Sequence, residues 1–152
     1  VLGTLANMTV IATYPDGRAV VGHRFVVPFA HVIPADKSDR TVAMPIPLPD
    51  GLRSSLARLP RDPISEENAD EVPASVLAAA PDHHGGDLLY IARTGRRIDD
   101  RFEKAIVRVD PELRFRSAYL PGVNAIHIAY LANRSISLIA DEEDRWYQCP
   151  TP

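Results

Sequence analysis

The feature that most restricts the fold is a series of short apolar segments rich in branched residues, each ended by turn-forming residues. The clearest case is Met8–Tyr14, which is followed by Pro15-Asp16-Gly17 and then by Arg18–Val27. Proline presets the first turn dihedral, aspartate bonds back to the backbone, and glycine accepts a positive φ. Two such segments joined by such a turn predict an antiparallel hairpin.

Short apolar segments separated by turn-forming residues continue along the chain. Further strands are predicted at Phe29–Ile33, Arg40–Met44, Asp87–Arg93, Ala105–Val109, Leu113–Leu120, Ala125–Ala132 and Ser135–Ala140. Their close spacing favours antiparallel hairpins, because parallel strands need long helical crossovers. We therefore expect a mainly β (α+β) fold, an antiparallel sandwich or a barrel-like sheet with one to three short inserted helices. We detect no internal repeat.

Three segments could supply the short helices. They are residues Asp50–Leu59, Pro73–Ala80 and Asp99–Lys104. The prolines of Pro45–Pro49 exclude a helix interior or a central strand, so this arm should run extended, close to polyproline II.

A length of 152 residues fits one domain. We expect a single β-rich domain at 8–146, with a flexible acidic insertion near 60–86 and terminal arms at 1–7 and 147–152. The insertion is inferred from residues 60–82, which hold six carboxylates against one basic residue, Arg61.

Charge and cysteine usage exclude several classes. A net charge of −3 argues against a general binder of nucleic acid or anionic membranes. No stretch reaches the roughly 18–20 apolar residues of a membrane-spanning helix. The single cysteine, Cys149, excludes an internal disulfide and a cysteine-built zinc site. We expect a cytoplasmic protein, or a virion-associated one, with no cofactor.

Basic residues are almost all arginine. Lys37 and Lys104 are the only lysines among 17 basic residues, which leaves 15 arginines. This bias, together with the many alanines, indicates a high-GC bacterium or its phage as the source.

One cluster of arginines is the best candidate for binding an anion. It comprises Arg93, Arg96, Arg97 and Arg101, and the first three flank Thr94-Gly95. Glycine lets backbone N–H groups approach a ligand, and guanidinium groups suit phosphate or carboxylate oxygens. The alternative is that the neighbouring acidic residues neutralise the cluster as surface ion pairs.

A weaker candidate is a metal site at His83, His84 and Asp87, where two glycines separate the histidines from the carboxylate. Imidazole and carboxylate ligands suit zinc and other first-row metals. Adjacent histidines seldom point at one centre, so a solvated loop is the favoured interpretation.

Arg93 is followed by Ser135-Ile136-Ser137 and then by Glu142 and Glu143. This order resembles that of one branch of ADP-ribosyltransferases. The resemblance implies an arginine that holds a phosphate of NAD and a glutamate that orients a ribose hydroxyl. The glutamates follow the serine motif too closely for an intervening strand and loop, so we assign no family. A small enzyme acting on a nucleotide or other phosphate-bearing substrate through the arginine cluster remains the alternative function.

Aromatic and proline residues favour a different function. Tryptophan, tyrosine and arginine dominate protein interfaces, and the candidate contacts are Pro45, Pro47, Trp146 and Tyr147. The competing interpretation is that the aromatic side chains fill this domain's own core. We expect a non-catalytic protein-binding or structural module that contacts a protein partner or its own copies.

Overall fold

The computed structural model describes residues 9–23, 29–36, 42–45, 78–81, 86–99, 101–131, 134 and 136–149. Every regular element within these ranges is a β-strand. The strands are β1 (Thr9–Thr13), β2 (Ala19–His23), β3 (Phe29–Ile33), β4 (Val42–Pro45), β5 (Ala78–Pro81), β6 (Leu88–Ile98), β7 (Arg101–Val109), β8 (Phe115–Tyr119), β9 (Ala125–Leu131), β10 (Ile136–Asp141) and β11 (Trp146–Gln148).

The strands form three antiparallel sheets, each of which follows the chain order. Sheet A has the order β1-β2-β3-β4, sheet B the order β5-β6-β7-β8, and sheet C the order β11-β10-β9. The expected mainly β, antiparallel fold is confirmed. The barrel-like alternative is wrong for the described ranges, because each of these strand orders is open at both edges and no sheet closes on itself.

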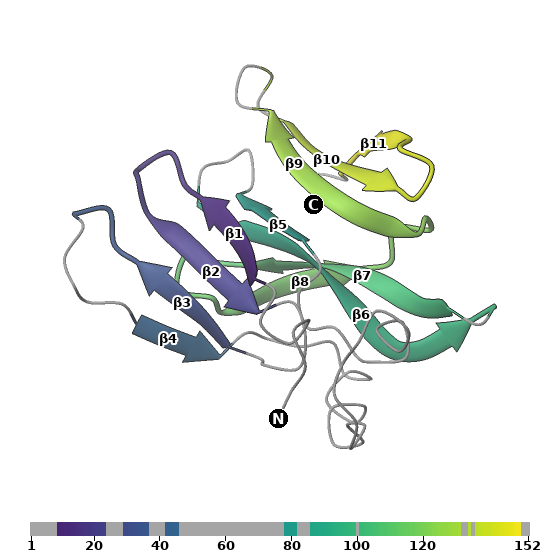
Figure 1. Cartoon of the computed structure of the whole chain (residues 1–152), viewed down its shortest axis with the longest axis horizontal. Helices are drawn as coiled ribbons and strands as arrows, with labels where there is room; N and C mark the ends of the chain where they lie inside the picture. Colours follow the sequence, from purple (N-terminus) through teal and green to yellow (C-terminus); the bar gives the residue numbers. More distant parts are fainter. Residues whose placement is uncertain are drawn as a thin grey trace.

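Sheet B lies between sheets A and C. The first strands of the three sheets are spatial neighbours, since β1 packs beside β5 and β5 beside β9. Figure 1 shows the sheets fanning out from these first strands, with β4 and β11 far from one another. The arrangement is a radial stack of sheets rather than one continuous sheet.

Side-chain alternation along the strands of sheet B builds two separate cores. Successive residues of a strand point to opposite faces, so Tyr90 and Val107 pack toward sheet A while Ile91 and Ile106 pack toward sheet C. All four are essentially inaccessible to solvent. The central part of sheet B, where β6 pairs with β7, is therefore buried on both faces.

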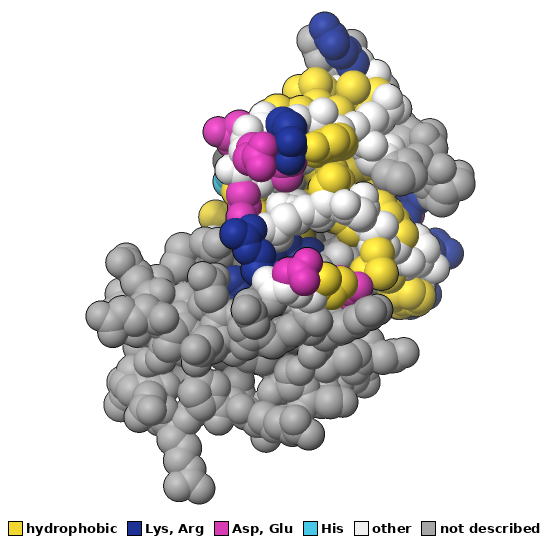
Figure 2. All heavy atoms as spheres, turned by 90° about the vertical axis from the view of Figure 1, so that its right-hand side faces the viewer, with side chains coloured by type: hydrophobic (Ala, Val, Ile, Leu, Met, Phe, Trp, Pro, Cys, Tyr) yellow, Lys and Arg dark blue, Asp and Glu magenta, His cyan; other side chains and the backbone are white. Residues whose placement is uncertain are grey.

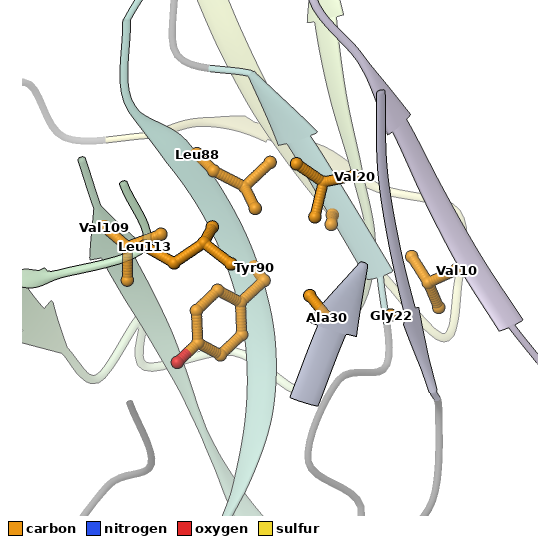
Figure 3. Close-up of a pocket in the computed structure, with 9 residues that line it drawn as sticks. Val10, Val20, Gly22, Ala30, Leu88, Tyr90, Val109 and Leu113 are labelled. Atoms are coloured by element: carbon orange, nitrogen blue, oxygen red, sulfur yellow. The ribbon is translucent and has the colours of Figure 1, made fainter. Parts of the chain in front are cut away.

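The core between sheets A and B is closely packed. Figure 3 shows Val20 and Ala30 of sheet A facing Leu88 and Tyr90 of sheet B. The apolar cavity between them has a volume of only about 10 Å³. A space of this size and polarity stays dry, so it is a packing void and not a ligand site.

Three hairpins turn through the same type of loop. The loops span residues 14–18, 110–114 and 141–145. In each loop the N–H of the first residue donates to the C=O of the fifth, and the N–H of the fourth residue donates to the C=O of the first. This is a type I turn followed by a left-handed residue. The left-handed residues are Gly17 (φ 89°), Leu113 (φ 59°) and Asp144 (φ 58°).

The hairpin predicted around Pro15-Asp16-Gly17 is confirmed, and Phe29–Ile33 is a strand with the expected bounds. The strand predicted at Asp87–Arg93 is longer than expected and continues to Ile98. Its extension pairs with β7 across an irregularity between Arg93 and Arg97.

Two of the expected helices are wrong where the structure describes them. Ala78–Ala80 belongs to β5, because it pairs with Leu89–Ile91 of β6 and its alanines fit a tightly packed strand. Residues 101–104 begin β7, whose pairing with β6 outweighs their local helical tendency. Sheet pairing overrides weak intrinsic propensity in both segments. The segment 50–59 lies outside the described residues.

The acidic insertion and the terminal arms are described only in part. Strand β5 and Gly86 fall inside the expected insertion, while its acidic part lies outside the described residues. At the C-terminal end, Tyr147 and Gln148 lie in β11, and Cys149 is buried with its N–H donating to the carbonyl of Ser137 at 2.8 Å.

Because sheet B supports both cores, removing side-chain volume from it should destabilise the whole fold. Ile91 is fully buried, so we expect Ile91→Ala to lower the free energy of unfolding by about 2–5 kcal/mol. Urea denaturation followed by circular dichroism measures the change. Ile98→Ala, on the same strand but 45% exposed, is the matched control and should stay within about 0.5 kcal/mol. Equal effects of the two substitutions would contradict the dependence of the fold on the side chains that sheet B buries.

The common loop makes a second prediction, about backbone strain. Gly17→Ala should cost about 1–2 kcal/mol through its left-handed φ, since the added Cβ meets only Ala35, at ordinary distances of 3.6 Å to its Cβ and 3.9 Å to its Cα. Asp144→Gly should stabilise the protein by up to about 1 kcal/mol, because glycine adopts the same φ without a Cβ clash. Thermal melting of the pair checks both signs. Destabilisation by Asp144→Gly would show that the side chain contributes more than the strain costs.

Candidate functional site

A groove opens where sheets B and C meet. Its walls are the β6–β7 hairpin, the link 120–124 between β8 and β9, and the turn 141–145. The wider part has a volume of about 520 Å³ and is lined by Ile98, Asp99, Arg101, Glu103, Lys104, Leu120, Gly122, Val123 and Asn124. A second part of about 290 Å³ shares Arg101 and Gly122–Asn124 and continues to the acidic turn. We take this groove as the candidate ligand site.

The acidic turn is organised around Asp141. The Oδ1 of this carboxylate accepts the backbone N–H groups of Glu143 (3.0 Å) and Arg145 (3.1 Å). Its Oδ2 accepts Nε of Arg145 at 2.8 Å and the hydroxyl of Tyr147 at 3.0 Å. The guanidinium of Arg145 also reaches Glu143 at 3.1 Å. A buried carboxylate thus stabilises the turn and the start of β11.

The same arrangement is present at the β7–β8 hairpin. Asp110 Oδ1 accepts the N–H groups of Glu112 (3.0 Å) and Arg114 (2.8 Å), and Asp110 Oδ2 accepts Nε of Arg114 at 2.7 Å. Glu112 bonds the same guanidinium at 2.9 Å. The residue six positions after the aspartate again reaches Oδ2, since Arg116 lies 3.7 Å away.

These two turns are a repeat that sequence analysis missed. Residues 110–116 read D-P-E-L-R-F-R and residues 141–147 read D-E-E-D-R-W-Y. The shared pattern is Asp-x-Glu-x-Arg-aromatic, and both aromatic residues, Phe115 and Trp146, are exposed. Only three of the seven positions are identical, the Asp, Glu and Arg whose side chains bond one another in each turn. Because these residues are polar, the spacing of apolar residues along the chain gives no sign of the repeat.

The hydrogen bonds determine the ionisation of both aspartates. Burial alone would raise the pKa of Asp141, but bonds from the Arg145 side chain and backbone, and from Tyr147 and Glu143, outweigh it and lower the pKa to about 2. Burial likewise opposes ionisation of Asp110, and the bonds from Arg114 and Glu112 lower its pKa below the usual value. Tyr147 donates its hydroxyl to Asp141, and this hydrogen bond raises the pKa of the Tyr147 phenol. Neither aspartate is poised to exchange a proton near neutral pH.

An ion pair links the two walls of the groove. Arg101, at the start of β7, bonds Glu142 in the turn of sheet C. Figure 2 shows basic side chains (dark blue) beside acidic ones (magenta) on this side of the molecule. Both side chains remain largely exposed, so the pair adds little stability. Its effect is to neutralise the groove locally.

The groove can therefore hold a polar or mixed ligand but shows no acid–base or nucleophilic set in its described lining. Its apolar contacts are Ile98, Leu120 and Val123, and its charged groups carry both signs. The amide nitrogen of Asn124 is buried and has no hydrogen-bond partner among the described residues, so it is a donor that a ligand in the groove could use.

The four predicted anion-binding arginines do not form one described site. Arg93 is buried in β6 and lies opposite Lys104, while Arg97 lies opposite Phe102. Arg101 pairs with Glu142 rather than with an open site. The side chains of Arg96 and Arg97 lie outside the described part of the structure.

The predicted metal ligands are described only at Asp87. Its carboxylate accepts Nε of Arg108 at 2.6 Å, in a pair that is mostly buried. His83 and His84 lie outside the described residues. Within the ranges that are described, no three His, Cys, Asp or Glu side chains gather as a metal site would require.

The interface candidates separate by face. Trp146 is 52% exposed, on the side of β11 that points away from sheet B, whereas Tyr147 packs into the core between sheets B and C. Pro45 ends β4, and Pro47 lies outside the described residues. Of the arginine, serine and glutamate triple, Glu142 contacts Arg101.

Comparison with known proteins gives no family. No protein-family model matches the chain, and no curated protein matches it.

The lowered aspartate pKa values predict acid sensitivity. An unfolded carboxyl of pKa 3.8 takes up its proton before the folded Asp141, whose pKa is about 2, so stability present above pH 3.8 is lost as the pH falls toward 2. We expect the melting temperature to fall over this window, and to fall less steeply in Asp141→Asn. Asp144→Asn, an exposed carboxylate of the same turn, is the control and should keep the wild-type slope. Identical slopes in all three proteins would exclude Asp141 as the source.

Proposed function

We propose that this chain is a non-catalytic module that binds protein through the two outer faces of its stack of sheets. The proposal rests on large apolar side chains that are exposed on the outer faces of sheets A and C. The opposite face of each of these sheets is buried against sheet B. Ile11 on sheet A is 61% exposed, and Trp146 on sheet C is 52% exposed.

The outer face of sheet C follows from its register. Ile128, Ile139 and Tyr147 pack toward sheet B, so the alternate positions point outward. Cross-strand pairing aligns the residues of this face in three rows: Leu131 with Ile136; Ala129 with Leu138 and Gln148; and His127 with Ala140 and Trp146. In the third row Ala140 is itself fully buried, and Trp146 and His127 on either side of it are exposed. Hydrophobic side chains (yellow) are exposed in the upper part of Figure 2, where sheet C lies.

The outer face of sheet A is built in the same way. Val10, Ala12 and Val20 pack toward sheet B, so Ile11 and its cross-strand neighbour Val21 point outward. The next row pairs Thr13 with Ala19 and Ala19 with Ile33, and Ile33 is exposed.

A protein partner suits these faces better than a small molecule does. Tryptophan is one of the residue types enriched at interface hot spots, and contiguous exposed apolar surface marks interaction sites. The groove, by contrast, is locally neutralised by Arg101 and Glu142. The alternative, an enzyme acting on a phosphate-bearing substrate, would need the arginine cluster to be open to its ligand.

The setting of this module is proposed from composition alone. The arginine bias supports a high-GC bacterium or its phage, and the contact function suits a cytoplasmic or virion-associated protein. None of the described elements is a helix that could span a bilayer.

Site-specific photo-cross-linking in the producing cell tests the proposal. A benzoylphenylalanine at position 146 or position 11 should give discrete protein adducts, which mass spectrometry identifies. Phe115, equally exposed but at the edge of sheet B, is the control position and should give none. Absence of a discrete adduct at both outer faces would contradict the proposed function.

The enzymatic alternative is tested separately by thermal shift. We expect NAD, nucleotides and divalent metal ions to leave the melting temperature unchanged. A rise of several degrees with any of them, removed by Arg96→Ala or His84→Ala, would favour the enzyme instead.

A further inference from the structure

We propose that the groove between sheets B and C binds an extended segment of a partner protein that carries a lysine or arginine, and that this segment pairs with an open edge of β7. The groove is a second contact surface. It goes beyond the proposed function, because it uses none of the side chains of the outer faces.

The first observation is a stretch of β7 whose backbone is paired on one side only. Strand β8 pairs with β7 from Ile106 to Val109, whereas β7 begins at Arg101. Within residues 101–105, β7 pairs with β6, and no described strand pairs with it on the other side. Figure 1 shows the end of the β6–β7 hairpin extending beyond β8. Backbone N–H and C=O groups along such an edge are a template for an added strand.

The local sequence explains why β8 leaves this edge open. Tyr119 is the last residue of β8, and Pro121 and Gly122 follow closely. Proline has no N–H to donate to a strand ladder, and Gly122 has a left-handed φ of 70°. The chain therefore turns away from β7 and forms the wall at 120–124. The groove lies between this wall and the unpaired part of β7.

The second observation is a buried donor in the wall of a groove large enough for a ligand. The wider part of the groove has a volume of about 520 Å³, within the range of about 300–1,000 Å³ that is typical of ligand sites. The amide nitrogen of Asn124 is buried there without a hydrogen-bond partner among the described residues. A buried donor without an acceptor is unfavourable. A backbone carbonyl of a bound segment would supply that acceptor.

The apolar side chains of the groove suit the stem of a basic residue. Ile98 on the β6–β7 hairpin is 45% exposed, and Leu120 on the facing wall is 55% exposed. Lysine and arginine cover apolar surface with their aliphatic stems and keep the charged end in a polar environment. A basic residue placed between Ile98 and Leu120 would cover both.

The charges of the groove favour a cation over an anion. Its described lining contains the carboxylates of Asp99, Glu103, Asp141, Glu142 and Glu143 and the cations Arg101, Lys104 and Arg145. At the sheet C end, Arg101 bonds Glu142, and Arg145 bonds both Asp141 and Glu143. Two guanidinium groups thus serve three carboxylates at this end. One basic side chain from a partner completes the pairing, whereas an acidic one adds to the excess.

Chemical-shift titration of the full ¹⁵N-labelled chain with short blocked peptides tests the proposal. The probe is Val-Thr-Lys-Val-Thr-Val, and we expect it to bind with a dissociation constant below about 1 mM and to shift amides in 101–105 and 120–124. The same peptide with glutamate in place of lysine should bind at least about tenfold more weakly. A version methylated on its backbone nitrogens keeps the charge but cannot donate N–H groups to β7, so it should not bind.

A matched pair of variants locates the site. Glu143→Lys should raise the dissociation constant of the lysine peptide at least about tenfold, because it reverses a charge in the groove lining. Glu112→Lys is the control: Glu112 holds the same position in the equivalent turn at 110–114 and is similarly exposed, but that turn lies at the other end of β7. It should leave binding unchanged. Asn124→Leu removes the buried donor and should also weaken binding. Circular dichroism confirms that each variant is folded.

Four results would overturn the proposal. They are no shift with the lysine peptide at several millimolar, equal binding of the glutamate peptide, equal binding of the methylated peptide, and equal weakening by Glu143→Lys and Glu112→Lys. The last two would show attraction by charge without strand pairing or without the groove. None of these results affects the outer faces, which cross-linking at positions 11 and 146 tests separately.

Discussion

Burial of the central strands of sheet B, β6 and β7, on both faces is the constraint on which the rest of the structure depends. Alternate residues of β6 and β7 supply two cores, with Tyr90 directed to one neighbour and Ile91 to the other. A sheet buried on both faces needs a partner sheet on each side, and this requirement sets the radial stack. It also determines which surfaces remain open, since sheets A and C each have one face in a core and one face outside it.

The second element of the architecture is the carboxylate-centred turn. Asp110 and Asp141 each satisfy two backbone N–H groups and one arginine within five residues of chain. This local network allows a left-handed residue other than glycine at the fourth position, where Leu113 and Asp144 lie. The turn at 141–145 also positions one wall of the groove, so the device that closes a hairpin also shapes a surface.

The hairpin and most strands could be predicted from the sequence because their signals are local. Alternating branched residues and the Pro15-Asp16-Gly17 turn fix β1 and β2 without reference to the rest of the chain. The alanines of β5 carried no such signal, and their strand forms only because β6 offers a pairing edge. Strand β11 was missed for a similar reason, since a short segment after an acidic run has little propensity of its own.

The site was less predictable than the fold. The groove depends on which loops meet at one end of the stack, and Arg101 contacts Glu142 across 41 positions of sequence. The arginine cluster was visible as a composition, but its members lie at different registers of β6 and β7. Residue type indicated candidate chemistry, whereas the topology decided which residues came together.

The central claim is that the outer faces are contact surfaces, and Trp146 reports on it directly because it is the only tryptophan in the chain. In a single copy its side chain is about half exposed. Acrylamide quenching and the emission maximum of this residue, measured before and after addition of the partner identified by cross-linking at position 11, test whether it becomes covered. The account predicts a blue shift and weaker quenching when the partner is added. A tryptophan that stays equally quenchable in the presence of that partner would contradict it.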